Sequence, residues 1–212
     1  AVLLSACSSP KHEPMPLVKF TPSMEVTEVW SKGLSSAEGF LVPAVYDDMV
    51  FAAGGKTLTR LNARTGETEW SVSFNSPITG GVGSDGYVTA VGLWDGNLEV
   101  VDAEGKVSWE KKLTTELASP PVVSHGLVIA RTMDTRVSAF EASSGELQWT
   151  YQRSQPALTV RLPTRMLAHD NFLLVGQPNG HIVILDIASG KPMFEFQVAQ
   201  AKGVTEVERL VD

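Results

Sequence analysis

One glycine-rich segment carries the letters of a nucleotide-binding motif. Gly81, Gly83 and Gly86 stand at the spacing of the Gly-x-Gly-x-x-Gly fingerprint, whose glycines bring backbone amides against a dinucleotide pyrophosphate. That chemistry needs a helix directly after the glycines, because the phosphate binds at the helix N-terminus. Tyr87 instead begins an apolar run typical of a strand. We therefore interpret these glycines as hairpin-turn residues.

The side chains that could ligate a metal or act as a base are scattered. Asp47 and Asp48 could suggest a cation site, but a hairpin turn explains the pair. No Gly-x-Ser-x-Gly elbow occurs, and no Ser, His and Asp set is suggested by spacing. The histidines lack metal-ligand spacing and are interpreted as solvated loop residues: His12, His125, His169 and His181. The sequence therefore predicts no catalytic residue, no metal site and no cofactor.

The single cysteine, Cys7, is the candidate for covalent modification. Residues 1–7 match the apolar end of a signal peptide that runs into a bacterial lipoprotein cleavage box, so we expect Cys7 to carry acyl chains. A free tail cysteine is the alternative, and one cysteine excludes an intrachain disulfide. The proline-rich stretch 8–23 predicts a tether. Ser8 after the cysteine is typical of lipoproteins sorted to the outer membrane, which predicts an anchor in its inner leaflet and a periplasmic domain.

The rest of the sequence repeats itself about every 40 residues. In each repeat a turn glycine is followed four residues later by a large aromatic residue: Gly66 by Trp70, Gly105 by Trp109, Gly145 by Trp149 and Gly190 by Phe194. A second turn marker, of residue types that tolerate left-handed backbone, stands upstream at Asp48, Gly86, Gly126 and Asn171. Short apolar runs between the turns indicate about four strands in each repeat, and helices should be few.

Repeats of four antiparallel strands predict an all-β propeller, in which each blade packs against its neighbours. We place the blades at about 40–74, 78–113, 119–153 and 158–198, with the start of a further blade at 199–212. The repeated aromatic residues are interpreted as packing between adjacent sheets rather than as a ligand cage. They are Trp30, Trp70, Trp109, Trp149 and Phe194.

Trp30 has no blade of its own. It lies 40 residues before Trp70, within the segment 24–31, which has the pattern of the last strand of a blade. Each of the four blades already has a final strand, so a closed four-bladed ring would leave this segment without a place. We therefore expect further blades after Asp212 in the natural protein, with 24–31 as the strand that closes the ring. The chain would then be an N-terminal fragment.

The composition argues against nucleic acid as a partner. The formal net charge is -7, and the sequence has no basic run or basic-aromatic stripe. With 43% hydrophobic residues the chain can bury a sizeable core, and the even spread of repeats favours one architecture rather than two domains.

The fourth repeat carries about five extra residues before its first strand. They fall within 152–163, where Leu158, Val160 and Arg161 stand together between two prolines. Insertions in a repeat array map to one face, often the binding face, and apolar residues beside an arginine have the composition of an interface hot spot. The alternative is that 158–162 is an extended first strand.

Together these features resemble the BamB family, the lipoprotein subunits of the outer-membrane β-barrel assembly machinery. The resemblance rests on the lipoprotein box, the tether, the tryptophan repeats, the Leu-x-Val-Arg loop and the ending 203–212. It implies about half of an eight-bladed propeller, and a non-enzymatic scaffold that aids folding and insertion of nascent outer-membrane proteins. The residues that it implies in contact with the periplasmic domains of the central barrel subunit are Leu158, Val160, Arg161 and Asp212.

Two other functions stay open at this point. The repeat is also similar to that of quinoprotein dehydrogenases, whose propellers carry pyrroloquinoline quinone above an adjacent cysteine pair, whereas this sequence has Cys7 alone. A periplasmic ligand-binding propeller would have a small-molecule pocket at the ring centre. Exposed blade edges could also hold extended substrate by β-augmentation.

Overall fold

The computed structural model describes residues 24, 26–35, 41–153, 165–177 and 180–198. In these ranges the chain forms strands and no helix. The strands are β1 (Ala44–Tyr46), β2 (Met49–Gly54), β3 (Thr57–Asn62), β4 (Thr68–Ser73), β5 (Ile78–Ser84), β6 (Thr89–Leu93), β7 (Asn97–Val101), β8 (Val107–Lys112), β9 (Val122–Ser124), β10 (Leu127–Arg131), β11 (Val137–Glu141), β12 (Leu147–Tyr151), β13 (Leu167–His169), β14 (Phe172–Gly176), β15 (His181–Asp186) and β16 (Pro192–Gln197).

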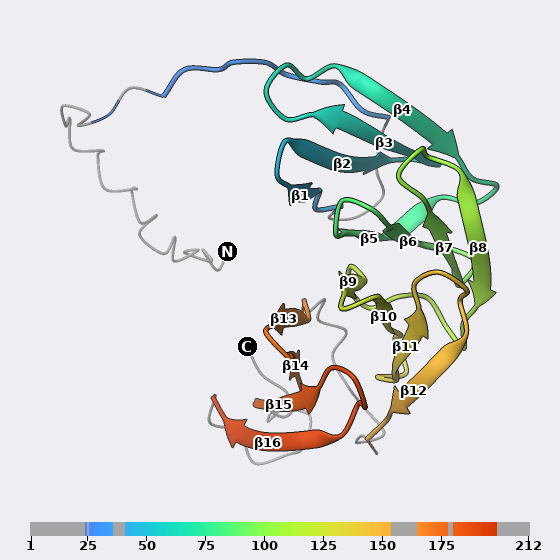
Figure 1. Ribbon diagram of the computed structural model, residues 1–212, viewed down its shortest axis with the longest axis vertical. Helices are drawn as coiled ribbons and strands as arrows, with labels where there is room; N and C mark the ends of the chain where they lie inside the picture. The colour runs from blue at the N-terminus through green and yellow to red at the C-terminus, as the bar shows by residue number, and fades with distance from the viewer. Residues whose placement is uncertain (1–23, 25, 36–40, 154–164, 178–179, 199–212) are drawn as a thin grey trace, which may run out of the picture.

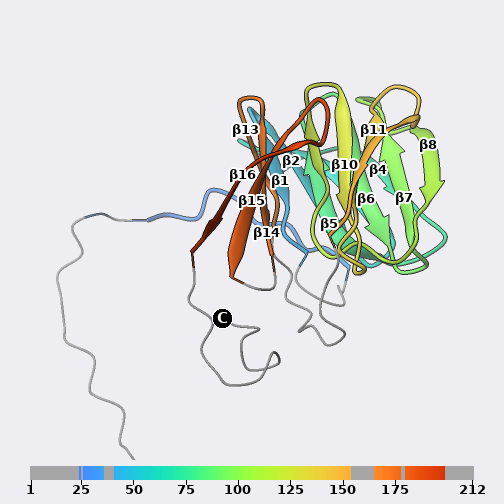
Figure 2. The ribbon, with the colours of Figure 1, turned by 90° about the horizontal axis from the view of Figure 1, so that it is seen from below.

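Consecutive strands pair into four antiparallel sheets of four strands each, which we number as blades one to four in chain order. The sheets follow one another around an arc, with β1, β5, β9 and β13 on its inner side and β4, β8, β12 and β16 on its outer side (Figure 1). Viewed from the side, the strands stand next to one another with hairpins at both ends (Figure 2). The predicted all-β propeller of four-stranded blades is confirmed.

The turn signals are correct in kind but displaced by one residue in two blades. Left-handed backbone was expected to centre on Asp48 and Asn171, yet the residues with positive φ are Asp47 and Asp170, each at 48°. Aspartate tolerates this region because its short side chain hydrogen-bonds locally. Sequence spacing alone does not resolve which of two adjacent polar residues takes this conformation.

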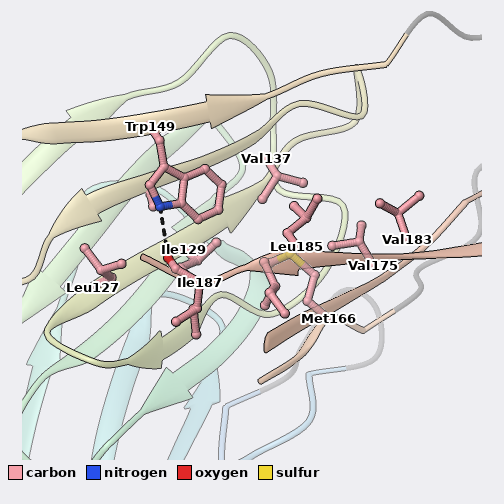
Figure 3. Packing of buried hydrophobic residues seen from close by; sticks show 11 residues of the cluster. Leu127, Ile129, Val137, Trp149, Met166, Val175, Val183, Leu185 and Ile187 are labelled. Carbon is pink, nitrogen blue, oxygen red and sulfur yellow. Dashed lines mark hydrogen bonds between the residues drawn. The ribbon is translucent and has the colours of Figure 1, made fainter. Parts of the chain in front are cut away.

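The hydrophobic core lies at the junctions between neighbouring blades. Three clusters of buried side chains fill the junctions one–two, two–three and three–four. At the last of these, Val137 and Ile129 of blade three meet Leu185 of blade four (Figure 3). Strands β6 and β10 are buried at every residue because a blade packs on each face, which explains why these segments are mostly apolar.

Each tryptophan of an outer strand docks on a turn of the following blade. Trp109 packs against Gly145, where a Cβ would lie 2.7 Å from ring atom Cδ2, so the ring needs glycine there. Gly145 also has φ +70°, which other residues rarely adopt. The indole Nε1 donates to a main-chain carbonyl beside this turn in each of three junctions: Trp70 to Ala103 at 2.9 Å, Trp109 to Ala142 at 2.8 Å and Trp149 to Ile187 at 3.0 Å.

Trp30 makes the same contact with blade one. Its Nε1 donates to the carbonyl of Ala63 at 2.9 Å, and a Cβ at Gly66 would lie 2.7 Å from its ring. Residues 26–35 form no strand in the described structure, so the ring-closing role expected for 24–31 stays a prediction.

The outer strand of blade four is exposed, whereas the tryptophans of the outer strands of blades one to three pack against the following blade. Strand β16 is exposed at every residue, and Phe194, at the position of the docking tryptophans, is 61% exposed. Among the described residues no further blade packs on this side, so the docking role expected for Phe194 stays a prediction. Met193 and Phe196 extend the apolar surface on either side of it.

Candidate functional site

The predicted site residues lie outside the described part of the chain. This holds for the expected lipidation site and for the expected partner-binding set: Cys7, Leu158, Val160, Arg161 and Asp212. The structure does describe Arg153, at the start of the predicted loop 152–163 and after β12, and Arg165, which follows that loop and precedes β13.

Arg153 and Arg165 belong to one face of the propeller. The connections between blades run along this face and pack against the turns between the second and third strand of each blade. For example, the Ile78 N–H donates to the Gly55 carbonyl at 2.8 Å. Arg153 and Arg165 are part of the connection from blade three to blade four. We call this side the connection face, and the side with the docked turn glycines the opposite face.

A polar cluster ties the start of the predicted docking loop to blade four. Arg153 Nη1 donates to Glu195 Oε1 at 2.5 Å, and His181 Nδ1 lies 2.7 Å from the same oxygen. The bond from His181, followed by the bond from Arg153, holds the pKa of Glu195 below its usual range. The bond to Glu195 raises the pKa of Arg153. The charged Arg153 is therefore fixed against the neighbouring blade.

The expectation that all histidines are solvated loop residues was wrong for His181. Strand β15 begins at this residue, so its half-buried ring faces Glu195 across the sheet instead of solvent. His125 and His169 are exposed beside turns, as predicted, and His12 lies outside the described residues. In the described ranges no group of three or more His, Cys, Asp or Glu could hold a metal ion.

The glycine fingerprint is not a set of turn glycines, which corrects the sequence interpretation. Gly81 and Gly83 lie inside β5, and only Gly86 occupies a hairpin turn. A Cβ at Gly83 would overlap the Pro121 carbonyl of blade three, so glycine is required for the close approach of two blades. No helix follows, in agreement with the rejection of a dinucleotide site.

A cavity of about 660 Å³ lies among the inner strands. The ligand-binding alternative expects a pocket at the ring centre, but no residue was assigned to it from the sequence. Segments of β1, β5, β9 and β13 line the cavity, and its polar side chains include Ser84, Ser124 and Arg165. Each blade contributes only a short piece of wall, so no local motif marks it. The described lining offers one cation and hydroxyl groups, but no paired acid and base. No helix in the described ranges is long and apolar enough to cross a membrane.

Glu99 is the most perturbed acid of the described structure. It lies in β7 opposite Glu110 in β8 and is only 7% exposed. Burial, followed by the charges of Glu110 and Asp95, raises the pKa of Glu99 from 4.5 to about 7. Because no sequence motif marks this strand pair, the sequence analysis did not single it out.

The raised pKa of Glu99 predicts that the protein loses stability between about pH 4.5 and pH 7. In this window the folded state retains a proton that the unfolded chain has released, so stability that is fully present below pH 4.5 falls as the pH rises through the folded pKa of about 7. Glu99→Gln removes this titration, and its melting temperature should change less between pH 5 and pH 8. Thermal unfolding followed by circular dichroism measures the effect, with exposed Glu104→Gln as the control. Parallel pH profiles for wild type and Glu99→Gln would contradict it.

The fold defines a class of protein: a β-propeller whose antiparallel four-stranded blades are joined by docked tryptophans. The chain belongs to the family described as outer membrane protein assembly factor BamB, whose family model matches residues 54–212. The BamB of Burkholderia pseudomallei is 38% identical over 217 residues, covering 100% of this chain and 57% of that protein. The BamB of Bordetella pertussis is 32% identical, covering 99% and 56%. The chain thus spans about half the length of the curated relatives it matches.

Solved structures agree with this family. The crystal structure of BamB from Moraxella catarrhalis superimposes with a TM-score of 0.70 at 28% identity, covering 80% of this chain and 52% of that one. A quinohemoprotein alcohol dehydrogenase from Pseudomonas putida matches with a TM-score of 0.59 at 18% identity, which shows a shared fold alone.

Proposed function

We propose that this chain is part of a non-enzymatic scaffold that docks the central subunit of the outer-membrane β-barrel assembly complex and aids folding and insertion of outer-membrane proteins. The observation that carries the proposal is membership of the BamB family over nearly the whole chain, with relatives described as assembly factors. The quinoprotein alternative has only the shared fold in its favour.

The proposed docking site is the loop after Arg153. Leu158 and Val160 would supply apolar contact, and Arg161 would pair with an acidic group of the partner's periplasmic domains, with Asp212 as a further contact. One hydrogen bond of the described structure supports this loop as a binding element. Arg153 is fixed to Glu195 of blade four, so the loop starts from a positioned residue on the connection face.

We also propose that Cys7 carries the lipid anchor that holds the protein at the inner leaflet of the outer membrane, facing the periplasm. Cys7→Ser removes the acylated thiol, so the protein should move from the membrane fraction to the soluble periplasmic fraction. Cell fractionation of strains that express the whole gene measures this. Unchanged membrane association of the Cys7→Ser protein would refute the anchor.

A binding experiment tests the proposed function. The purified protein is titrated against immobilised periplasmic domains of the central barrel subunit, with an unrelated propeller of similar charge as control. We expect saturable binding by this protein and none by the control. Equal signals from the two propellers would contradict the proposal.

A further inference from the structure

Two crevices open on the outer side of the described blades. The crevice between blades two and three has a volume of about 330 Å³, and the one before blade one has a volume of about 220 Å³. Both sit between the residues that follow a docked tryptophan and the third and fourth strands of the next blade.

The two crevices are lined by the same kinds of residue at equivalent positions. Lys111 follows Trp109 by two residues, and Lys32 follows Trp30 by the same interval, so a lysine stands at each rim. The floor of each is a cross-strand pair of hydroxyls. These pairs are Thr59 with Ser71 at 3.0 Å and Ser138 with Thr150 at 3.4 Å.

The other two junctions have different side chains at the equivalent places. Phe74 fills the junction between blades one and two and is 9% exposed. Tyr151 packs into the junction between blades three and four, and Arg153 there binds Glu195. The hydroxyl pair is also replaced, by Glu99 and Glu110 in blade two and by Glu195 in blade four. In the described residues, crevices with a lysine and a hydroxyl pair therefore alternate with junctions that contain glutamates.

The crevice between blades two and three is positive in a chain of net charge -7. Its lining includes Lys111, Lys112 and Arg136 and no acidic residue. The Lys112 ammonium donates to the Asp95 carbonyl. Arg136 forms an ion pair with Asp134, with 3.8 Å between Nε and Oδ2, and its side chain is 36% exposed. Its Nε is buried and makes no hydrogen bond, so a bound carboxylate would pair with Lys111 and with the part of Arg136 that lines the crevice.

We propose that this crevice binds an acidic side chain of an extended polypeptide whose neighbouring residues are apolar. Lys111 and Arg136 would hold the carboxylate, and the hydroxyl of Thr150 would donate to it. Leu113, Phe140 and Leu147 line the same crevice and would contact the apolar neighbours. The lining residues belong to blades two and three and to the connection between them, so the proposal does not depend on the proposed docking of the barrel subunit.

Fluorescence anisotropy with three labelled peptides tests the proposal on the intact protein. The first is a hexapeptide with one glutamate among leucines and valines and both termini blocked. The second has glutamine in place of the glutamate, and the third has the glutamine and a free carboxyl terminus. We expect the glutamate peptide to bind at least about tenfold more tightly than the glutamine peptide, because a charge-assisted hydrogen bond is lost with the carboxylate.

Variants locate the binding in the crevice. Lys111→Met and Arg136→Met should each weaken binding of the glutamate peptide about tenfold, and the near-isosteric Thr150→Val by a smaller factor. Lys106→Met, at an exposed turn on the opposite face, should leave it unchanged. Three results would overturn the proposal: equal affinity for the glutamate and glutamine peptides, equal losses in Lys106→Met and Lys111→Met, or binding of the free-terminus peptide alone. We expect Lys111→Met and Thr150→Val to fold, because Lys111 is exposed and valine has nearly the shape of threonine. A loss of binding in these two variants therefore reports on the crevice.

Discussion

Replacing Trp149 by alanine is expected to lower the free energy of unfolding by about 3 to 5 kcal/mol, the range for removing a buried aromatic residue. Trp149 is 8% exposed, whereas Trp70 and Trp109 are half-buried. Its ring packs with the cluster between blades three and four, and its Nε1 donates to the Ile187 carbonyl at 3.0 Å (Figure 3). The substitution would open a cavity at the junction and leave a buried carbonyl without its donor.

Equilibrium unfolding in urea measures this effect. Trp94→Ala is the matched control, because Trp94 is 59% exposed beside the β6–β7 turn and should cost less than about 1 kcal/mol. Trp149→Phe should fall between the two, since it keeps part of the ring volume and loses the hydrogen bond. Similar losses for Trp94→Ala and Trp149→Ala would show that the docked indole does not join the blades.

Arg161→Glu is expected to weaken binding to the periplasmic domains of the barrel subunit by about 100-fold or more. The reversal replaces an attractive pair by two like charges at the proposed contact and leaves the partner's acid without its counter-ion. Interferometry with wild-type and variant protein measures the loss, and circular dichroism checks that the blades stay folded. Arg64→Glu is the control, because Arg64 is 77% exposed on the opposite face. Equal loss in both variants would indicate a nonspecific charge effect.

The propeller could be predicted because the same turn and docking residues recur at one place in each repeat. A glycine four residues before a tryptophan marks a turn that must be left-handed and must also receive the ring of the preceding blade. Both requirements apply to the same position, for example Gly145 in blade three. Each repeat therefore has a glycine there, and the spacing from glycine to aromatic residue can be recognised in the sequence. The strand order follows once each repeat is known to be a meander.

Contacts that occur at one place and do not recur in the other repeats could not be predicted in the same way. Arg153 and Glu195 are 42 residues apart, and neither has a distinctive neighbour in the sequence. The raised pKa of Glu99 depends on burial and on its register opposite Glu110, and a one-residue shift of β8 would remove it. The role of Gly83 in β5 could not be predicted either, because glycine is required there by the close approach of Pro121 from another blade.

Photo-crosslinking in cells tests the docking claim most directly. A crosslinking amino acid is placed at Leu158 or, as a control, at Glu146, an exposed turn residue on the opposite face. Our account predicts a covalent adduct with the central barrel-assembly subunit from position 158 and none from position 146. An adduct from position 146 alone, or from neither position, would contradict it.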